Sequence, residues 1–347
     1  MKTLEEYIAM VKPAEKKVLQ DVQTRLDSQT KPPGSLGKLE ELCKQLAKAQ
    51  VTANPCCDRR IIFTMAADHG VAREGTSAYP QSVTAQMVAN FINGGAAVNV
   101  LAKHGGCEVV VVDMGVCSDL ECRGFVNRKI DYGTRSFARG PAMSMEQARR
   151  AVEAGIQLAL DYDFDVLGTG DMGIGNTAAS SAVASVLMGR DPAEVTGKGT
   201  GIDDRMLHKK IEVIRTGIAV NRPDPQKPLE VLSRVGGFEI GGIAGLILGA
   251  AIKKKLAVVD GFISTAGAMI AHALSPAVDD YFIISHLSAE RGHHNLVGYL
   301  GKSPLLDLEM RLGEGTGSAV AMEVLDAAVR LYYDMATFDQ AGVDKKA

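Results

Sequence analysis

The 347-residue chain lacks a surplus of positive charge. It carries 38 Lys and Arg residues against 41 Asp and Glu residues, which gives a formal net charge of −3 at pH 7. Proteins that bind nucleic acid through its phosphates carry an excess of basic residues on the binding domain. We therefore expect no nucleic acid among the partners of this protein.

Long hydrophobic runs are missing as well, although 46% of the residues are hydrophobic and can fill a large core. The most apolar stretch, residues 241–252, is too short and too rich in glycine to span a bilayer. Residues 1–17 mix acidic and basic side chains with Pro13, where a secretory signal has an uninterrupted apolar run. The sequence predicts a soluble, globular, cytoplasmic protein that makes no contact with a membrane.

Cysteine is scarce, with six residues in the chain. Their spacings fit neither the paired cysteines of a zinc site nor a small disulfide framework. Cys117 and Cys122, with Asp119 and Glu121 nearby, come closest to a metal site, but no histidine stands at ligand spacing. We expect reduced thiols, no bound metal and no other cofactor.

One pattern repeats along the chain. A short β-branched run ends in a cluster of Asp, Gly, His or Ser, and a longer Ala-rich stretch suited to a helix follows. Alternating strands and helices predict an α/β fold with a parallel sheet flanked by helices, a Rossmann-like large domain that binds ligands beyond the carboxyl ends of its strands. The five runs and their polar clusters are residues 60–66 with 67–70, 108–112 with 113–115, 164–167 with 168–171, 256–259 with 260–262, and 281–284 with 285–286.

The two ends of the chain have a different, helical pattern. Residues 3–27 and 36–49 are predicted helices separated by residues 31–34 (KPPG), and residues 317–336 form a last helix with no strand after it. We expect both ends to pack together as a small helical domain, built from residues 1–49 and 306–347, beside a large domain over residues 50–305. The chain shows no internal repeat and no low-complexity segment.

Residues 168–173 match G-x-G-x-x-G between a predicted strand and the helical run 177–188. Taken alone, this motif indicates dinucleotide binding and an NAD-dependent oxidoreductase. However, Asp171 stands inside the turn, where its charge would repel a pyrophosphate, and two strand-ending clusters precede the motif. A turn whose amides meet a single phosphate or ribose at a helix N-terminus remains open, with Asp171 suited to ribose hydroxyls.

A second glycine cluster, residues 197–201 (GKGTG), precedes Arg205, Lys209 and Lys210. Glycine turns with lysines suit a monophosphate, because amides supply directed donors and an ammonium supplies a mobile charge. A solvated loop with surface lysines fits the same pattern.

The third cluster is residues 310–317 (MRLGEGTG), in which glycines flank Glu314. The missing neighbouring side chains leave this carboxylate approachable. The alternative is a tight turn that enters the last helix with Thr316 or Ser318 as its N-cap.

Together these residues resemble the nicotinate-nucleotide:dimethylbenzimidazole phosphoribosyltransferase family, often called CobT. The matching stretches occur in order and cover nearly the whole chain. They are residues 31–37 (KPPGSLG), 67–70 (ADHG), 168–177 (GTGDMGIGNT), 235–238 (VGGF), 259–262 (VDGF), 285–286 (SH) and 311–317 (RLGEGTG).

The resemblance implies an α/β large domain with a small helical domain, in a homodimer or in a heterodimer with a paralogous subunit. It implies that Glu314 is the general base and that Asp171, where some members have glutamate, assists it. Residues 77–87 resemble the stretch that faces the acceptor base, and Tyr79 replaces a smaller polar residue of some members. The implied nucleotide- and phosphate-binding residues are Gly173, Asn176, Thr177, Gly199, Lys210 and Gly313, and the implied base-binding residues are Tyr79, Gln86, Met87, Met172 and Leu312.

The implied substrates are nicotinate mononucleotide and an aromatic acceptor base. The ring nitrogen of the nucleotide is already cationic, so nicotinate can leave without protonation, and one carboxylate suffices to take the proton of the acceptor. Family members accept benzimidazoles, purines or, in a two-subunit branch, phenols such as p-cresol, and the sequence leaves this choice open. A non-catalytic partner subunit and the NAD-dependent oxidoreductase remain as rival interpretations.

Overall fold

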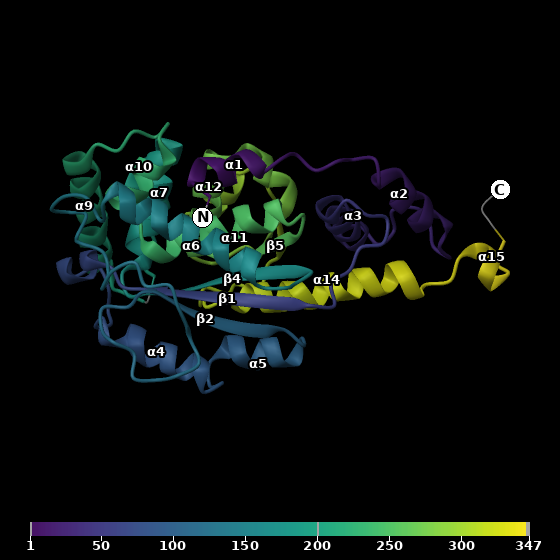
Figure 1. Ribbon diagram of the computed structural model, residues 1–347, viewed down its shortest axis with the longest axis horizontal. Helices are drawn as coiled ribbons and strands as arrows, with labels where there is room; N and C mark the ends of the chain where they lie inside the picture. The colour runs from purple at the N-terminus through teal and green to yellow at the C-terminus, as the bar shows by residue number, and fades with distance from the viewer. Residues whose placement is uncertain (1, 200, 345–347) are drawn as a thin grey trace.

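The computed structural model describes residues 2–199 and 201–344. Within these residues, seven strands form one parallel sheet in the order β3-β2-β1-β4-β5-β6-β7. Figure 1 shows β2, β1, β4 and β5 in this order. The α/β fold class and all five predicted strands are confirmed. The strands are β1 (Arg60–Ala67), β2 (Glu108–Gly115), β3 (Val126–Asn127), β4 (Val166–Met172), β5 (Leu256–Val259), β6 (Phe282–His286) and β7 (Pro304–Leu306).

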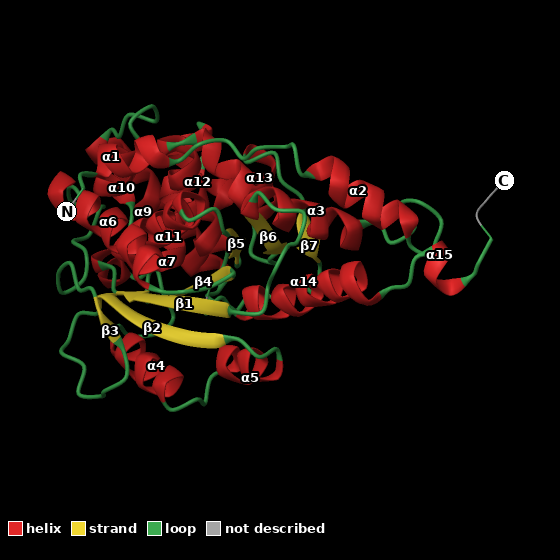
Figure 2. Cartoon of the chain, turned by 45° about the vertical axis from the view of Figure 1, so that its right-hand side comes forward, coloured by secondary structure: helices red, strands yellow, loops and turns green. Residues whose placement is uncertain are grey.

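Helices cover both faces of this sheet (Figure 2). On one face lie α4 (Ser82–Ile92), α5 (Ala97–His104) and the first turns of α14 (Thr316–Asp334). The other face carries α6 (Met145–Asp161), α11 (Phe238–Ile252) and α12 (Phe262–Leu274). Further helices are α7 (Asn176–Met188), α8 (Pro192–Val195), α9 (Asp204–Asn221), α10 (Pro228–Val235) and α13 (His293–Tyr299), with 3-10 turns at Gly70–Glu74 and Pro276–Tyr281.

Two strands and one boundary differ from the sequence-based prediction. The edge strands β3 and β7 have two and three residues, too short for a recognisable β pattern. Strand β4 runs to Met172, so most of the G-x-G-x-x-G motif is strand rather than turn. Its first two glycines are needed for packing: a Cβ at Gly168 would press on Ser318, and a Cβ at Gly170 would overlap the carbonyl of Glu314.

The helices near the termini lie in two places. A single helix over residues 3–27 was predicted, but the chain forms α1 (Leu4–Met10) and α2 (Leu19–Ser28), because Pro13 and its steric effect on the preceding residue disfavour helix between them. Helix α1 packs on α6 and α11, where Arg149 binds Glu5. At the opposite end of the molecule lie α2, α3 (Lys38–Gln50) and α15 (Phe338–Ala341) (Figures 1 and 2).

A small apolar cluster joins α2, α3 and the last turns of α14. It consists of Val22, Leu26, Cys43, Ala47 and Tyr332, all buried. The first turns of α14 instead pack beneath β4, β5 and β6. The division into a domain over residues 50–305 and a helical domain from both termini stays a prediction. Because α1 packs on α6 and α11, it lies with the helices that cover the sheet and not with α2 and α3.

Close packing of α6 against α11 explains the glycine-rich stretch at residues 241–252. A Cβ added to Gly155 would overlap the carbonyl of Gly242, and one added to Gly245 would overlap the carbonyl of Val152. Glycine at these positions therefore lets the two helix backbones touch. Helix α11 is buried from Phe238 to Ala251, so it forms the centre of the core rather than a membrane segment.

The substitution Gly245→Ala should destabilise the fold by roughly 1–3 kcal/mol, because a methyl group is forced into a filled space. Urea unfolding followed by circular dichroism measures this loss. The matched control is Gly298→Ala in α13, where an added Cβ has nothing within 4 Å. The control should be neutral or stabilising by up to about 1 kcal/mol, since alanine favours helix over glycine. Equal stabilities of the two variants would contradict this account of the packing.

Candidate active site

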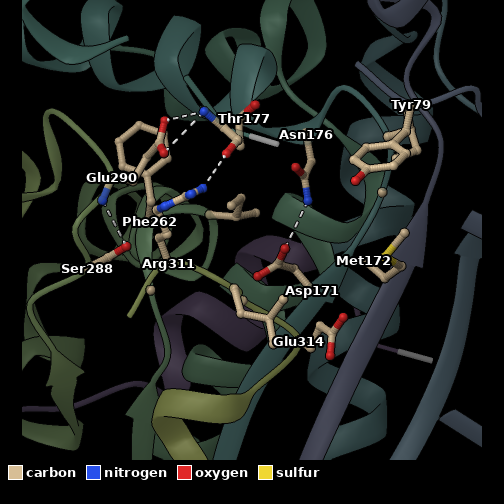
Figure 3. A pocket seen from close by; sticks show the side chains of 17 residues that line it. Tyr79, Asp171, Met172, Asn176, Thr177, Phe262, Ser288, Glu290, Arg311 and Glu314 are labelled. Atoms are coloured by element: carbon tan, nitrogen blue, oxygen red, sulfur yellow. Dashed lines mark hydrogen bonds between the residues drawn. The ribbon is translucent and has the colours of Figure 1, made fainter. Parts of the chain in front are cut away.

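The strand order reverses between β1 and β4: the strands that follow β1 in the chain, β2 and β3, lie on one side of this pair, and β5 to β7 lie on the other. In open α/β sheets, ligands bind beyond the carboxyl ends of the strands at such a switch point. A cavity of about 300 Å³ opens there (Figure 3). Its lining residues are Tyr79, Asp171, Met172, Gly173, Ile174, Asn176, Thr177, Gly199, Gly261, Phe262, Ile263, Ser288, Glu290, Arg311, Leu312, Gly313 and Glu314.

The backbone of Glu314 has a conformation that side chains rarely adopt. Its φ is +67°, between Gly313 at +83° and Gly315 at +98°. A left-handed residue other than glycine raises the free energy of the fold by about 1–3 kcal/mol unless its surroundings hold it. Here the hydroxyl of Thr64 donates to the Glu314 carbonyl at 2.9 Å, and Gly170 lies against the same carbonyl.

Asp260, at the end of β5, holds the other side of this loop. Its carboxylate accepts hydrogen bonds from the backbone amides of Gly315 at 3.0 Å, Gly317 at 2.7 Å and Ser318 at 3.2 Å. These amides form the N-terminus of α14, where a negative charge is favoured by unpaired N–H groups and the helix dipole.

The predicted N-cap of α14, Thr316 or Ser318, is wrong. The N-cap is Gly315, and no side chain of its own caps the helix. The hydroxyl of Thr316 donates to the Gly313 carbonyl, and that of Ser318 donates to carbonyls of β4 and β5. Asp260 supplies the cap from a distant part of the chain, which the local sequence could not indicate.

Burial shifts the acidity of the carboxyl groups around the cavity. The pKa of Glu314 is raised to about 7, first by burial and then by the nearby charge of Asp260. Burial also raises the pKa of Asp171 well above its usual range, with further contributions from Asp260, Glu239 and Glu314. Glu314 can therefore exchange a proton near neutral pH, while Asp171 favours its neutral form.

Asp171 lies in the middle of the cavity wall. The side-chain amide of Asn176 donates to its Oδ2 at 2.9 Å, and its Oδ1 has no hydrogen-bond partner among the described residues (Figure 3). The same view places Tyr79 and Met172 on one side of Asp171, and Ser288, Glu290 and Arg311 on the other. The cavity thus has one end formed by Tyr79 and Met172 and a polar end, where Phe262 lies on the same side as the charged side chains.

Helix α7 begins at the polar end. Gly175 is its N-cap with φ +99°, and Asn176 and Thr177 of its first turn line the cavity. The Thr177 hydroxyl accepts a hydrogen bond of 2.8 Å from Nζ of Lys210, which also donates to the Gly197 carbonyl at 3.1 Å. A helix N-terminus with a cation behind it favours an anionic ligand.

Lys210 is almost completely buried. Burial lowers the pKa of its ammonium to about 8, and the nearby carboxylate of Glu290 partly opposes this shift. The side chain does not line the cavity and reaches it through Thr177 and the turn at Gly197.

Comparisons with known proteins agree on one family. The sequence model of a family described as phosphoribosyltransferase matches residues 11–343. A nicotinate-nucleotide–dimethylbenzimidazole phosphoribosyltransferase of Geobacter metallireducens is 49% identical over 99% of both chains, and one of Roseiflexus sp. is 52% identical over 100% of this chain and 99% of its own. The crystal structure of CobT from Thermus thermophilus superposes with a TM-score of 0.91 at 44% identity, covering 95% of this chain and 100% of that one. The chain belongs to the nicotinate-nucleotide–dimethylbenzimidazole phosphoribosyltransferase family.

The transferase is a glycosyltransferase of the pentosyltransferase class, and the comparisons give no support to an oxidoreductase. The structure supplies a physical reason. Gly168 and Gly170 lie inside β4 and are covered by Ser318 and Glu314, so a pyrophosphate cannot approach them. Gly173 is needed because a Cβ there would overlap the carbonyl of Ala67.

The structure brings most of the predicted site residues of the transferase together. Three do not line the cavity: Lys210 lies behind it, while Gln86 is exposed and Met87 half-buried on α4. The residues that line it as predicted are Tyr79, Asp171, Met172, Gly173, Asn176, Thr177, Gly199, Leu312, Gly313 and Glu314.

Sequence reasoning assigned no role to several lining residues. Ser288 and Glu290 come from the loop after β6, and Phe262 and Arg311 follow β5 and β7. Ser288 and Glu290 have no sequence signal beyond a position shortly after a strand, whereas Phe262 and Arg311 lie in the family-like stretches 259–262 and 311–317.

Among residues 2–199 and 201–344, no group of three or more His, Cys, Asp or Glu side chains is arranged to hold a metal ion. No helix in the same range combines the length and apolar character that crossing a bilayer requires. All six cysteines are unpaired.

The raised pKa of Glu314 predicts a stability effect. Its carboxyl group favours the folded state while protonated, and this contribution is lost as the pH rises through about 7. At about pH 8, Glu314→Gln should therefore increase the free energy of unfolding by roughly 1–2 kcal/mol, because it removes a buried charge that solvent screens only in part.

Urea unfolding at several pH values measures this difference. It should shrink as the pH falls to about 5, where both side chains are neutral. Equal stability of the two proteins at about pH 8 would show that Glu314 is not destabilised by burial.

Proposed function

We propose that the protein transfers the 5-phosphoribosyl group of nicotinate mononucleotide to a lower-ligand base such as 5,6-dimethylbenzimidazole. The products are α-ribazole phosphate and nicotinate, in the assembly of the cobamide nucleotide loop. The names of the relatives support these substrates. The observation that carries the proposal is Glu314, a buried carboxylate with a pKa of about 7 at one side of a two-ended cavity.

The polar end suits the nucleotide phosphate. The first turn of α7 presents Thr177, and the glycine turns at Gly173 and Gly199 line the wall beside it. Lys210 supplies positive charge from behind through Thr177. Directed N–H groups with a nearby cation are the usual means of holding a phosphate. Asn176 and Gly313 both lie close to Asp171. In this proposal the ribose binds beside these three residues, next to the phosphate.

The opposite end suits a flat, apolar acceptor. Met172 presents apolar surface there and Tyr79 adds an aromatic ring, and Leu312 also lines the cavity. Tyr79 and Leu312 are 54% and 56% exposed, so a bound ring would cover surface that is now open to water. Covering such surface favours binding by about 25 cal/mol per Å².

In the reaction, a ring nitrogen of the benzimidazole bonds to C1′ as the bond from C1′ to nicotinate breaks. The electron pair of the broken bond returns to the pyridine nitrogen and neutralises its positive charge. The acceptor becomes cationic and gives its remaining N–H proton to Glu314, whose pKa of about 7 suits a general base. Asp171 favours its neutral form, so it can donate a hydrogen bond to a ribose oxygen and help to position C1′.

The family resemblance also supports a dimer, either of two identical chains or with a paralogous subunit, acting in the cytoplasm. Light scattering at micromolar concentration measures the assembly. The phenolic acceptors of the two-subunit branch would use the same base, with the proton lost from oxygen.

A competition experiment tests the acceptor. The protein is incubated with nicotinate mononucleotide and equal amounts of 5,6-dimethylbenzimidazole, adenine and phenol, and mass spectrometry identifies the ribosyl phosphates. The benzimidazole product should dominate, because its ring matches the apolar end of the cavity. A phenolic product in excess would assign the protein to the other branch, and the absence of any product would reject the proposed function.

The substitution Glu314→Gln tests the general base. Turnover should fall by roughly 10²–10⁴, the usual contribution of a positioned base, while nucleotide affinity stays nearly unchanged. In the parent protein, turnover should rise with pH through about 7 as Glu314 loses its proton. Near-normal turnover in the folded variant would remove Glu314 from catalysis.

Glu309→Gln is the matched control, since Glu309 is an exposed glutamate before the same loop and also has a positive φ, +56°. It should leave turnover and its pH dependence unchanged.

A further inference from the structure

Glu290 places a carboxylate in the polar end of the cavity. It follows β6 and is only 8% exposed. The backbone amide of Gly199 donates to both of its oxygens, at 3.0 Å to Oε1 and 3.2 Å to Oε2 (Figure 3). The turn that contains Gly197 and Gly199 packs closely against this carboxylate, because a Cβ at Gly197 would overlap Oε1 of Glu290. The side chain therefore occupies a place in which the backbone N–H group of Gly199 holds an anion.

Under the function proposed above, on which this inference rests, the Gly199 amide is one of the donors to the nucleotide phosphate. A carboxylate that holds this amide and a phosphate dianion cannot share it, because one N–H group forms one strong hydrogen bond and the two anions repel. We propose that Glu290 competes with the nucleotide phosphate for the Gly199 amide and thereby sets the affinity for phosphate-bearing ligands.

The turn at Gly197 and Gly199 has other anchors. Nζ of Lys210 donates to the Gly197 carbonyl at 3.1 Å, and the guanidinium of Arg311 donates to the Gly199 carbonyl at 3.1 Å. These bonds hold both glycines without any contribution from Glu290. Release of the carboxylate therefore frees an amide donor and leaves the turn in place.

Glu290 also has space to move. It lines a second cavity of about 460 Å³, together with Lys198, Asp204, Arg291 and Arg311. Because Asp204 pairs with Lys198 at 2.8 Å, the positive charge near a displaced, solvated carboxylate in this cavity comes from Arg291 and Arg311. The two cavities adjoin at Glu290 and Arg311, because both residues line each of them.

This competition has a consequence for catalysis. The substrate and the product of the proposed reaction carry the same 5′-phosphate, so the carboxylate weakens the binding of both. It thereby favours release of the product. A nucleoside without phosphate leaves the carboxylate on its amide and binds without opposition from it.

Calorimetric titration of Glu290→Gln tests the inference with two probes, nicotinate mononucleotide and the nucleoside nicotinate riboside. A neutral acceptor holds the Gly199 amide less tightly than a carboxylate does. The mononucleotide should therefore bind roughly tenfold more tightly, since hydrogen bonds to charged and neutral groups differ by about 1–1.5 kcal/mol. Affinity for the nucleoside should not change.

Glu290→Asp separates competition for the amide from simple charge repulsion. Aspartate keeps the negative charge but is one methylene shorter and cannot reach the amide in the same geometry. Competition predicts tighter mononucleotide binding in this variant too, whereas repulsion alone predicts no change. Glu212→Gln, at an exposed glutamate of α9 paired with Arg215, is the matched control and should bind as the parent does.

Weaker or unchanged mononucleotide binding in Glu290→Gln would overturn the inference, because it would mean that the carboxylate supports the turn. Failure of both variants to fold would overturn it for the same reason. An equal gain for nucleoside and mononucleotide would also contradict it. If the parent protein does not bind nicotinate mononucleotide at all, the proposed function fails instead, so the two failures can be told apart.

Discussion

The carboxylate of Asp260 at the N-terminus of α14 is the interaction on which the site depends. It joins the end of β5 to three amides of the loop that carries Glu314. Hydrogen bonds from N–H groups at a helix N-terminus favour the charged form of a buried carboxylate and offset part of the penalty of its burial. This interaction both positions Glu314 and raises its pKa, because the negative charge of Asp260 lies close enough to disfavour a second one. Asp260 therefore contributes to both the position and the basicity of the proposed base, while burial makes the larger contribution to its raised pKa.

Glycines in this protein mostly permit close contact between backbones, and only some of them belong to the cavity. Gly170 lets the Glu314 carbonyl approach β4, while Gly155 and Gly245 let α6 and α11 touch. A glycine motif after a strand therefore has two physical explanations, phosphate binding and backbone packing, which the letters alone cannot distinguish. The G-x-G-x-x-G match indicated a dinucleotide for this reason, although its first two glycines are inside the sheet.

The sequence predicted the parts of the structure that depend on local pattern. The β-branched runs located five strands, and the glycines around Glu314 indicated an approachable carboxylate. Contacts between distant residues could not be predicted in this way: Asp260 meets Gly317 across 57 positions, and Gly199 meets Glu290 across 91. Lys210 was predicted to bind the phosphate, but its burial behind the cavity could not be predicted, because burial is a property of the folded chain. Gln86 and Met87 were placed by resemblance alone, and in this structure they lie outside the cavity lining.

The carboxyl groups of Asp171, Asp260 and Glu314 lie close together at the cavity. The charges of the proposed reaction explain how such a cluster can serve catalysis. Burial raises the pKa of Asp171 and Glu314, and the nearby charge of Asp260 raises both further, so ionising these groups together destabilises the empty site. The nucleotide brings a cationic ring, and positive charge then moves from nicotinate to the acceptor as the bonds exchange. Negative charge on Asp260 and on ionised Glu314 stabilises positive charge at C1′ while the bonds exchange, and in a water-poor site its effect is larger than in solution. The same repulsion that raises the free energy of the empty site thus lowers the barrier for a cationic transition state. A site built for an anionic intermediate would instead place donors at this position, as the polar end does for phosphate.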